Sequence, residues 1–438
     1  MVRDGLRAAL TEDAFGLAAL RIAVVGVLLV SPELHAAKGL AERPELLVAT
    51  PEGLGLFARR SFSPELVAAV RIVAITVGAT ALLGYWARLS CAVLSLSAAF
   101  LISFSQRTGA ALHDMHLLWL LALLATSRCA DVWSLDAWGK GMPAASLAYG
   151  VPLCLARALL GVVYLFPGLH KLWSGGFSWG AADNVRAILY SKWFQHGHVP
   201  ALRVDQLPDW LLTAGGTGVL LFELTFVVLA LWRPTRLVAL GLGLWFHLST
   251  QAFFFIGFWG LLACYVVLIP WRGVCARLIR GAPPASWRAP VLLWPSVLAG
   301  TLLLVANGVQ GVRGQTQAFP FACYPKFEHV GLMVAPDLMV ELARADGSVL
   351  RIERDFSHYR TQREWGRVYS LLGAYGARPS DEQLRRFAVE RAQARGLGAE
   401  LARAERVRFY AGEYSTRPED WGKAPLGVQL LQELPATR

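Results

Sequence analysis

The sequence predicts an all-α polytopic membrane bundle of about nine transmembrane helices, with a small soluble α+β domain at the C-terminus. Three observations support this prediction. Of the 438 residues, 55% are hydrophobic and only 17% are charged, against about 25% charged in ordinary soluble proteins. The long apolar runs lie between residues 14 and 306, and the charge density of a soluble protein follows them. We therefore expect a membrane domain over residues 1–308 and a soluble domain over residues 309–438.

The apolar runs give the expected spans, because a helix needs about 20 apolar residues to cross the hydrocarbon core. Most runs are bounded by Pro, Gly or Arg, which commonly punctuate helices. In chain order the predicted spans cover residues 14–30, 66–86, 89–104, 111–127, 150–172, 211–232, 237–254, 256–271 and 290–306.

Positively charged short loops predict the orientation of the bundle. With nine spans, the loops that carry Arg88, Arg128 and Arg233 fall on the side of the N-terminus. We therefore expect a cytoplasmic N-terminus and an extracytoplasmic C-terminal domain. Residues 173–208 are too polar to span a bilayer but are rich in aromatic side chains, which favour the membrane interface. We expect this segment, here called the outer cover, to form interfacial or re-entrant helices over the outer end of the bundle.

Local signals predict the structure of the C-terminal domain. Asp346-Gly347 lies between two strand-like runs, 338–342 and 349–353, which is typical of a β-hairpin. Two helices are expected next, the second with an N-cap at Ser380 and Gln383 three residues later. A late strand is expected over residues 406–411.

Composition excludes several kinds of site. The net charge of +11 does not indicate a nucleic-acid partner, because no Lys/Arg stripe is interleaved with aromatics. The six cysteines form no CxxC pair, so neither a disulfide framework nor a metal site is predicted.

Ionisable residues within spans cost about 2.5–3.5 kcal/mol each on insertion scales, so each one calls for a function or a partner. Lys171 ends the fifth span, beside His170. It either snorkels to the interface or is desolvated and acts as a base. Glu223 lies in the sixth span, and Arg21, Arg71 and Arg157 lie in the first, second and fifth. We expect internal ion pairing there, with Glu223 bound to one of the arginines.

Two histidine-containing segments complete the set of candidate residues. The fourth span opens with His113, Asp114 and His116, and histidines three residues apart share one helix face. A polar helix cap and a functional site are both consistent with this pattern, whereas a metal pair lacks a third ligand. His247 lies in mid-span, where it is either satisfied by hydrogen bonds or lines a cavity.

Taken in order, three segments resemble the vitamin K-dependent γ-carboxylase family, whose membrane region is shared with bacterial HTTM (horizontally transferred transmembrane) proteins. Leu112-His113-Asp114, followed by Trp133-Ser134-Leu135-Asp136, is similar to the His-containing helix and the Trp-Ser-hydrophobic-Asp turn of the family. Residues 164–172 with Trp179-Gly180 resemble its aromatic-Gly-x-x-Lys-Leu…Trp-x-x-Gly segment. Residues 246–258 resemble its Phe-His…Gln-x-Phe-x-Ile-Gly block.

This resemblance implies a bacterial inner-membrane enzyme in which Lys171 deprotonates a reduced quinone of the vitamin K or menaquinol type, with His113 as its helper. The chemistry would be that of a carboxylase, a lyase that also epoxidises the quinone. The expected partners are the lipid bilayer, a quinol-like molecule and a secreted peptide or protein. Residues expected to contribute to cofactor binding are His170, His247, Asp114, Trp179 and Gln251. His170 departs from the family, which has a second Lys at that position.

Two other functions stay open. A non-enzymatic member of the family could act in the maturation or export of a secreted peptide, or in immunity to one. Lys171 would then be an interfacial anchor, and Lys171→Arg would be tolerated. A transporter has less support, because the sequence shows neither an inverted repeat nor paired broken helices.

Overall fold

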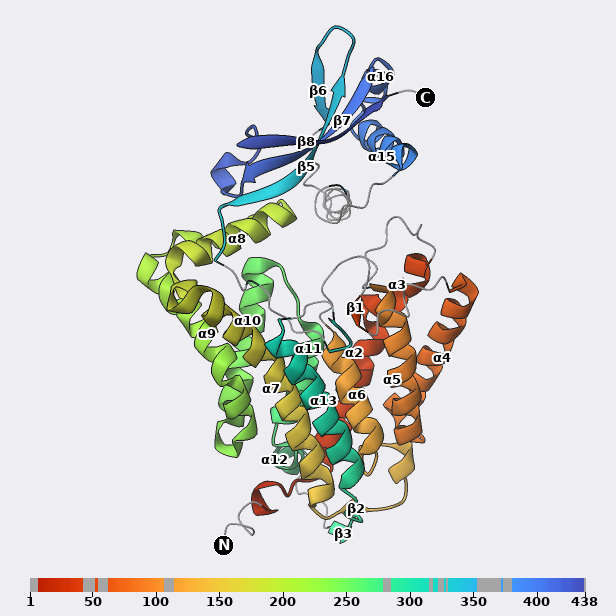
Figure 1. Ribbon diagram of the computed structural model, residues 1–438. Helices are drawn as coiled ribbons and strands as arrows, with labels where there is room; N and C mark the ends of the chain where they lie inside the picture. Colours follow the sequence, from red (N-terminus) through yellow and green to blue (C-terminus); the bar gives the residue numbers. More distant parts are fainter. Residues whose placement is uncertain are drawn as a thin grey trace.

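The chain folds into a helical bundle with a small β-sheet beyond one end (Figure 1). This computed structural model describes residues 7–41, 52–53, 62–105, 114–278, 285–314, 318–321, 327, 330–352, 372 and 380–436. The described N-terminal residues lie at the end of the bundle opposite to the sheet. This arrangement agrees with an odd number of crossings, while the sidedness of the two ends stays a prediction.

The described helices follow the predicted apolar runs. The bundle consists of α2 (Phe15–Val30), α3 (Pro32–Ala41), α4 (Pro64–Leu83), α5 (Ala87–Ser103), α6 (Met115–Thr126), α7 (Leu147–Gly175), α9 (Asp209–Leu231), α10 (Arg236–Phe254), α11 (Trp259–Cys264), η8 (Tyr265–Leu268), α12 (Trp271–Leu278) and α13 (Trp294–Val312). The outer cover forms η5 (Gly176–Gly180), α8 (Ala182–His196) and η6 (Val204–Gln206).

Six of the described helical segments are long and apolar enough to cross a membrane, and a bent pair raises the number to seven if it is one span. The chain is therefore a multi-pass membrane protein, but the predicted count of about nine is not confirmed. The predicted third and fourth spans form α5 and α6, of 17 and 12 residues. Twelve residues rise only about 18 Å, whereas the hydrocarbon core is about 30 Å thick. The predicted eighth span is broken before Trp271 and bends there by 80°.

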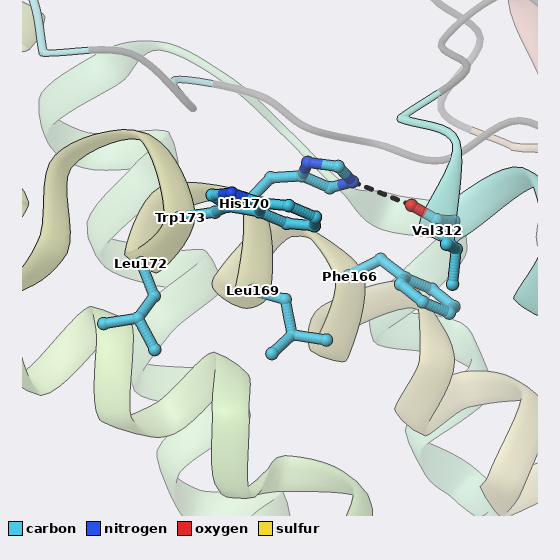
Figure 2. Close-up of a pocket in the computed structure, with 7 residues that line it drawn as sticks. Phe166, Leu169, His170, Leu172, Trp173 and Val312 are labelled. Atoms are coloured by element: carbon cyan, nitrogen blue, oxygen red, sulfur yellow. Dashed lines mark hydrogen bonds between the residues drawn. The ribbon is translucent and has the colours of Figure 1, made fainter.

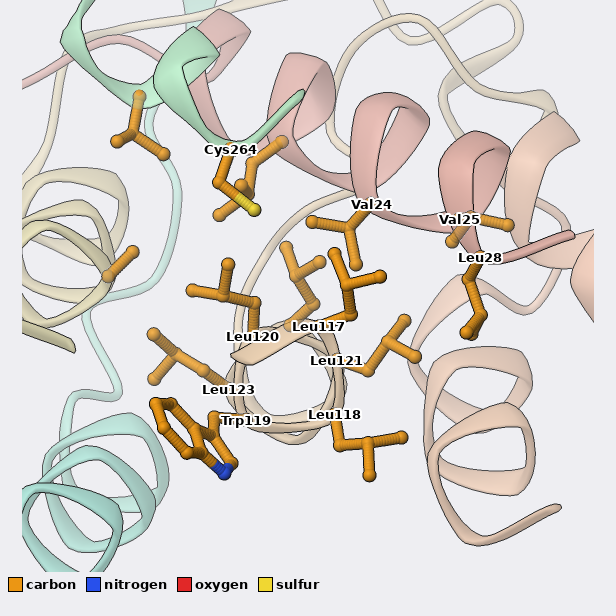
Figure 3. Close-up of a cluster of buried hydrophobic side chains, with 14 of the residues drawn as sticks. Val24, Val25, Leu28, Leu117, Leu118, Trp119, Leu120, Leu121, Leu123 and Cys264 are labelled. Carbon is orange, nitrogen blue, oxygen red and sulfur yellow. The ribbon is translucent and has the colours of Figure 1, made fainter. Parts of the chain in front are cut away.

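Helix α6 forms the centre of the largest hydrophobic cluster (Figure 3). Its residues Leu117, Leu120 and Leu121 are buried, as are Val24 and Leu28 on the neighbouring helix α2. A helix that is apolar on all sides lies inside a bundle or a membrane. Here α6 is enclosed by other helices.

Polar side chains bind backbone groups at the end of the bundle near the N-terminus. The carboxylate of Asp136 accepts hydrogen bonds from the N–H groups of Trp86 (2.9 Å) and Ala87 (3.0 Å), where α5 begins. The guanidinium of the buried Arg21 donates to the carbonyls of Ala81 (2.9 Å) and Trp133 (2.5 Å). The Trp-Ser-hydrophobic-Asp turn is therefore a helix cap, since carboxylates stabilise helix N-termini.

Two glycines allow α7 and α9 to pack closely. A Cβ atom at Gly161 would lie 2.6 Å from Val227, and one at Gly168 would lie 3.0 Å from the Cβ atom of Glu223. Small residues at helix interfaces let the two backbones approach. Gly168 lies one turn before Lys171, so this close approach brings Glu223 to the face of α7 that carries Lys171.

The C-terminal domain has a four-stranded antiparallel sheet in the order β6-β5-β7-β8. The strands are β5 (Val334–Ala343), β6 (Val349–Ile352), β7 (Arg406–Ser415) and β8 (Gly427–Pro435), with helices α15 (Asp381–Ala394) and α16 (Gly398–Ala402). The predicted hairpin, the capping box at Ser380 and the late strand are confirmed. The first predicted helix of this domain lies outside the described residues, and β8 was not predicted.

Candidate functional site

An ion pair inside the bundle joins α7 to α9. The ammonium of Lys171 donates a hydrogen bond to Oε1 of Glu223, and each residue is only 4% exposed. Charged groups inside a membrane domain are rare and are mostly paired or functional. The expectation that Glu223 pairs with an arginine was therefore wrong.

The face of an aromatic ring covers this ion pair. The Nζ atom of Lys171 lies 4.8 Å from the ring centroid of Trp179, which is itself buried. Cations are attracted to the electron-rich face of an indole. Trp179 packs with Ile188 and Leu220 in one hydrophobic cluster. The structure therefore brings two of the predicted site residues, Lys171 and Trp179, together under the outer cover.

One oxygen of the Glu223 carboxylate is buried without a hydrogen-bond donor among the described residues. Oε2 of Glu223 is buried and accepts no hydrogen bond from the residues that the structure describes. A buried polar atom without a partner costs about 1–3 kcal/mol, and more when it is charged. Such an atom is a candidate for binding a ligand hydroxyl.

A buried hydrogen-bond network joins α7 to α10 and η8. The hydroxyl of Tyr164 is 2.6 Å from Nε2 of His247 and 2.5 Å from the hydroxyl of Tyr265. Its ring contacts Phe222 and Phe226, which flank Glu223 on α9. His247 is thus hydrogen-bonded through Nε2, while its Nδ1 atom has no partner among the described residues.

The other predicted binding residues are more widely spread. His113 lies outside the described residues. Asp114 immediately precedes α6, where its carboxylate packs directly against Gly260 of α11. Gln251 is exposed on α10, with its side-chain oxygen against Gly257. Among the described residues, the amine of Lys171 therefore contacts Glu223 and Trp179 but neither Asp114 nor Gln251.

His170 faces a different helix from Lys171. Its Nε2 atom lies 2.7 Å from the carbonyl oxygen of Gly311 on α13, and its ring stacks on Trp173 (Figure 2). These residues line a pocket of about 320 Å³ together with Phe166, Leu169, Leu172 and Val312. The pocket is almost entirely apolar and lies between α7 and α13.

Arg157 and Arg21 have partners other than Glu223. The guanidinium of Arg157 donates to both carboxylate oxygens of Glu12, at 2.6 and 2.9 Å, and Arg236 donates to one of them at 2.8 Å. Arg21 binds backbone carbonyls, as described above, and Arg71 is half-buried on α4. These interactions are structural and lie away from Lys171.

Sequence reasoning missed four residues, three of them near the site and one, Glu12, at the other end of α7. Glu12, Tyr164, Asn184 and Tyr265 all bind functional or structural groups from distant parts of the chain. A signal was available for Tyr164, which lies seven residues before Lys171 and therefore on the same helix face. The other three gave no local signal.

A comparison with protein families places most of these residues in a single domain. The model of the HTTM domain matches residues 55–271, a range that contains Lys171, Trp179, Glu223 and His247. HTTM domains are associated with vitamin K-dependent carboxylase-like membrane proteins. Searches of curated proteins and of solved structures found no significant match.

Proposed function

We propose that this multi-pass protein, with its HTTM-domain match over residues 55–271, is a membrane enzyme that binds a quinol-like or lipid-like molecule. Lys171 would act as the base that abstracts a proton, in carboxylation or epoxidation chemistry. The observation that carries the proposal is the buried pair of Lys171 and Glu223 beneath Trp179. Groups that are costly to bury in a membrane domain mark functional sites by default.

The pair gives Lys171 a route to the basic form. Transfer of one proton from Nζ to Oε1 of Glu223 converts two buried charges into a neutral amine and a carboxylic acid. Desolvation penalises the charged forms, so this transfer costs much less inside the bundle than in water. The neutral amine then has a lone pair with which to accept a proton from a bound ligand.

The surrounding residues fit a ligand with a hydroxyl group on an aromatic ring. Oε2 of Glu223 is a buried acceptor without a partner, and Trp179 offers an aromatic surface. When bound, a reduced quinone would supply an acidic hydroxyl on an electron-rich ring. The apolar pocket beside Leu169 is at the lower end of the size range of ligand pockets and would accept a hydrocarbon chain.

Substitution of Lys171 tests the proposal. In lipid nanodiscs that contain a reduced menaquinone, oxygen and labelled carbon dioxide with a glutamate-containing peptide, we expect Lys171→Ala to lower quinol consumption by about 100-fold or more. Lys171→Arg should fail equally, because a guanidinium does not give up its proton. Lys140→Ala removes an exposed lysine and should retain full activity. Full turnover by either Lys171 variant would refute the proposal.

The apolar pocket makes a separate prediction. Leu169→Trp should fill it and weaken the binding of a prenylated quinol about tenfold, the effect of roughly 1.4 kcal/mol. Binding of the tailless ring should not change. Leu302→Trp, on the exposed side of α13, is the matched control. Equal binding of the prenylated quinol by both variants would exclude the pocket as the site of the chain.

The non-enzymatic alternative also has an observation in its favour. The amine of Lys171 is already bound to a carboxylate, so the pair could serve only to hold α7 against α9. In that case Lys171→Arg would preserve the pair and the biological role in peptide maturation, export or immunity. Quinol consumption by the wild type therefore separates the two functions, because a non-enzymatic protein would consume none.

A further inference from the structure

Trp179 is held in place by a segment that leads into the C-terminal domain. Its indole N–H donates a 2.6 Å hydrogen bond to the carbonyl oxygen of Phe327. The ring of Phe327 in turn packs against Phe254 and lies beneath the ammonium of Lys192 on α8. The residue that covers Lys171 is thus bound to a part of the chain about 150 residues away.

Asn184 makes a second connection with both ends of its side-chain amide. Its Nδ2 group donates to the carbonyl oxygen of Trp179 at 2.5 Å, and its Oδ1 atom accepts from the N–H of Gly331 at 2.6 Å. Asn184 is only 3% exposed. Buried amides that bridge two segments hold both of them, because loss of either bond leaves a polar group without a partner.

The fit of this segment against the outer cover is tight. A Cβ atom at Gly331 would lie 3.0 Å from the side chain of Ala187 on α8. One at Gly175 would lie 3.2 Å from Val330 and 3.1 Å from Trp179. Glycine on each side of the contact therefore lets the two backbones approach without displacing their neighbours.

Residues 330–333 lead directly into the C-terminal sheet. Strand β5 begins at Val334, and the carbonyl oxygen of Met333 accepts a hydrogen bond from the N–H of Thr416 at 3.0 Å. The domain also contacts the other end of α8, where Phe194 lies 6.3 Å from the rings of both Tyr414 and Trp421. A displacement of the sheet would therefore pull on the segment and on α8 together.

We propose that residues 330–333 form a strap through which the C-terminal domain holds Trp179 over Lys171, and that release of this strap admits ligand to the site. Trp179 and Asn184 are then positioning residues, since they act by placing the cover. The strap would regulate the proposed base, and in this respect the inference rests on the proposed function. The test of the strap measures how accessible the site is to a reagent and does not depend on enzymatic turnover.

The experiment uses Leu220→Cys as a reporter in the full-length protein. Leu220 is fully buried and packs beneath Trp179. The rate of modification by a charged, membrane-impermeant thiol reagent is followed by mass spectrometry of the peptide that contains residue 220, so native cysteines do not interfere. We expect Asn184→Ala to raise this rate about tenfold or more, because loss of a buried hydrogen-bonded group shifts such equilibria by that factor.

Asn307→Ala is the matched control, because Asn307 is 5% exposed and its amide binds Leu303 within α13, away from the strap. It should leave the rate unchanged. Gly331→Leu forces the strap away from α8 without altering any helix and should also raise the rate, which guards against misfolding of Asn184→Ala. Wild-type rates in both Asn184→Ala and Gly331→Leu would overturn the inference, whereas retained turnover in Lys171→Ala would refute only the proposed function.

Discussion

Replacing either Lys171 or Glu223 alone will destabilise the folded protein by about 3–5 kcal/mol, and replacing both will cost much less. Glu223→Leu leaves a buried ammonium without its counter-ion, and Lys171→Met leaves a buried carboxylate. In the double variant no charge remains to be desolvated, and two apolar side chains of similar length fill the space. The free energy of unfolding, measured by reversible denaturation in mixed micelles, gives all four values of this double-mutant cycle.

An exposed pair provides the comparison for this cycle. Lys423 pairs with Asp420 on the C-terminal domain, with the lysine side chain 65% exposed, and such pairs contribute about 0–1 kcal/mol. Lys423→Met should therefore cost little. If the losses in the two single variants at 171 and 223 simply add in the double variant, the two charges are not coupled as described here.

The double variant also separates stability from function. A protein with Met at position 171 and Leu at position 223 should fold but should not consume quinol, because neither the amine nor the acceptor oxygen remains. A structural anchor predicts the opposite result, a folded protein that keeps its role. Stability and function are therefore tested in one molecule, and neither needs to be inferred from the other.

The sequence predicted Lys171 but not its partner. Hydrophobicity identifies which segments are apolar, yet it does not say which helix faces which, so Glu223 was expected to meet an arginine. The choice of partner depends on the close packing of α7 and α9 at Gly161 and Gly168. Glycines seven residues apart on one helix face are a signal for such packing, and this signal lies in the sequence beside Lys171.

The number of spans could not be read from composition alone. A bilayer core and a protein core are about equally apolar, so a helix enclosed by other helices has the same composition as one that faces lipid. Helix α6 is such a case, since Leu117 and Leu121 are fully buried. That α6 has only 12 residues and lies inside the bundle is seen only in the three-dimensional structure.

Local features of the C-terminal domain could be predicted from the sequence, whereas the contacts between the strap region and the outer cover could not. The hairpin at Gly347 and the capping box at Ser380 depend on neighbouring residues, and both are confirmed. The hydrogen bond of Trp179 to Phe327 joins residues 148 positions apart, and that of Asn184 to Gly331 of the strap joins residues 147 positions apart. No pattern within a single window of sequence contains such a pair.

A second large effect is expected at the opposite end of α7, where Glu12 joins the N-terminal segment to the bundle. Glu12→Gln should destabilise the protein by about 3 kcal/mol, at the low end of the range for breaking a buried pair, because Arg157 is only 2% exposed. Burial alone would raise the pKa of the Glu12 carboxyl, but the nearby guanidinium groups of Arg157 and Arg236 outweigh it and lower this pKa.

The lowered pKa fixes the direction of the pH dependence. A carboxyl that binds protons more weakly when folded stabilises the protein above its unfolded pKa, near the ordinary value of 4.5. That stability is lost as the pH falls through the lower folded value. The difference in unfolding free energy between wild type and Glu12→Gln should thus be constant near neutral pH and shrink below about pH 4.5.

Glu65→Gln is the control for this pH dependence, because Glu65 is exposed in the first turn of α4. Its unfolding free energy should follow that of wild type throughout the acid range. Parallel curves for Glu12→Gln and wild type would show that Arg157 and Arg236 do not hold a charged carboxylate at Glu12.

The same variant should not affect the proposed reaction. Lys171 lies about 20 Å along α7 from Arg157, the partner of Glu12. Quinol consumption per folded molecule should therefore be the same in Glu12→Gln as in wild type. A loss of turnover without a loss of folded protein would mean that the two ends of α7 are coupled, contrary to the local character of both ion pairs.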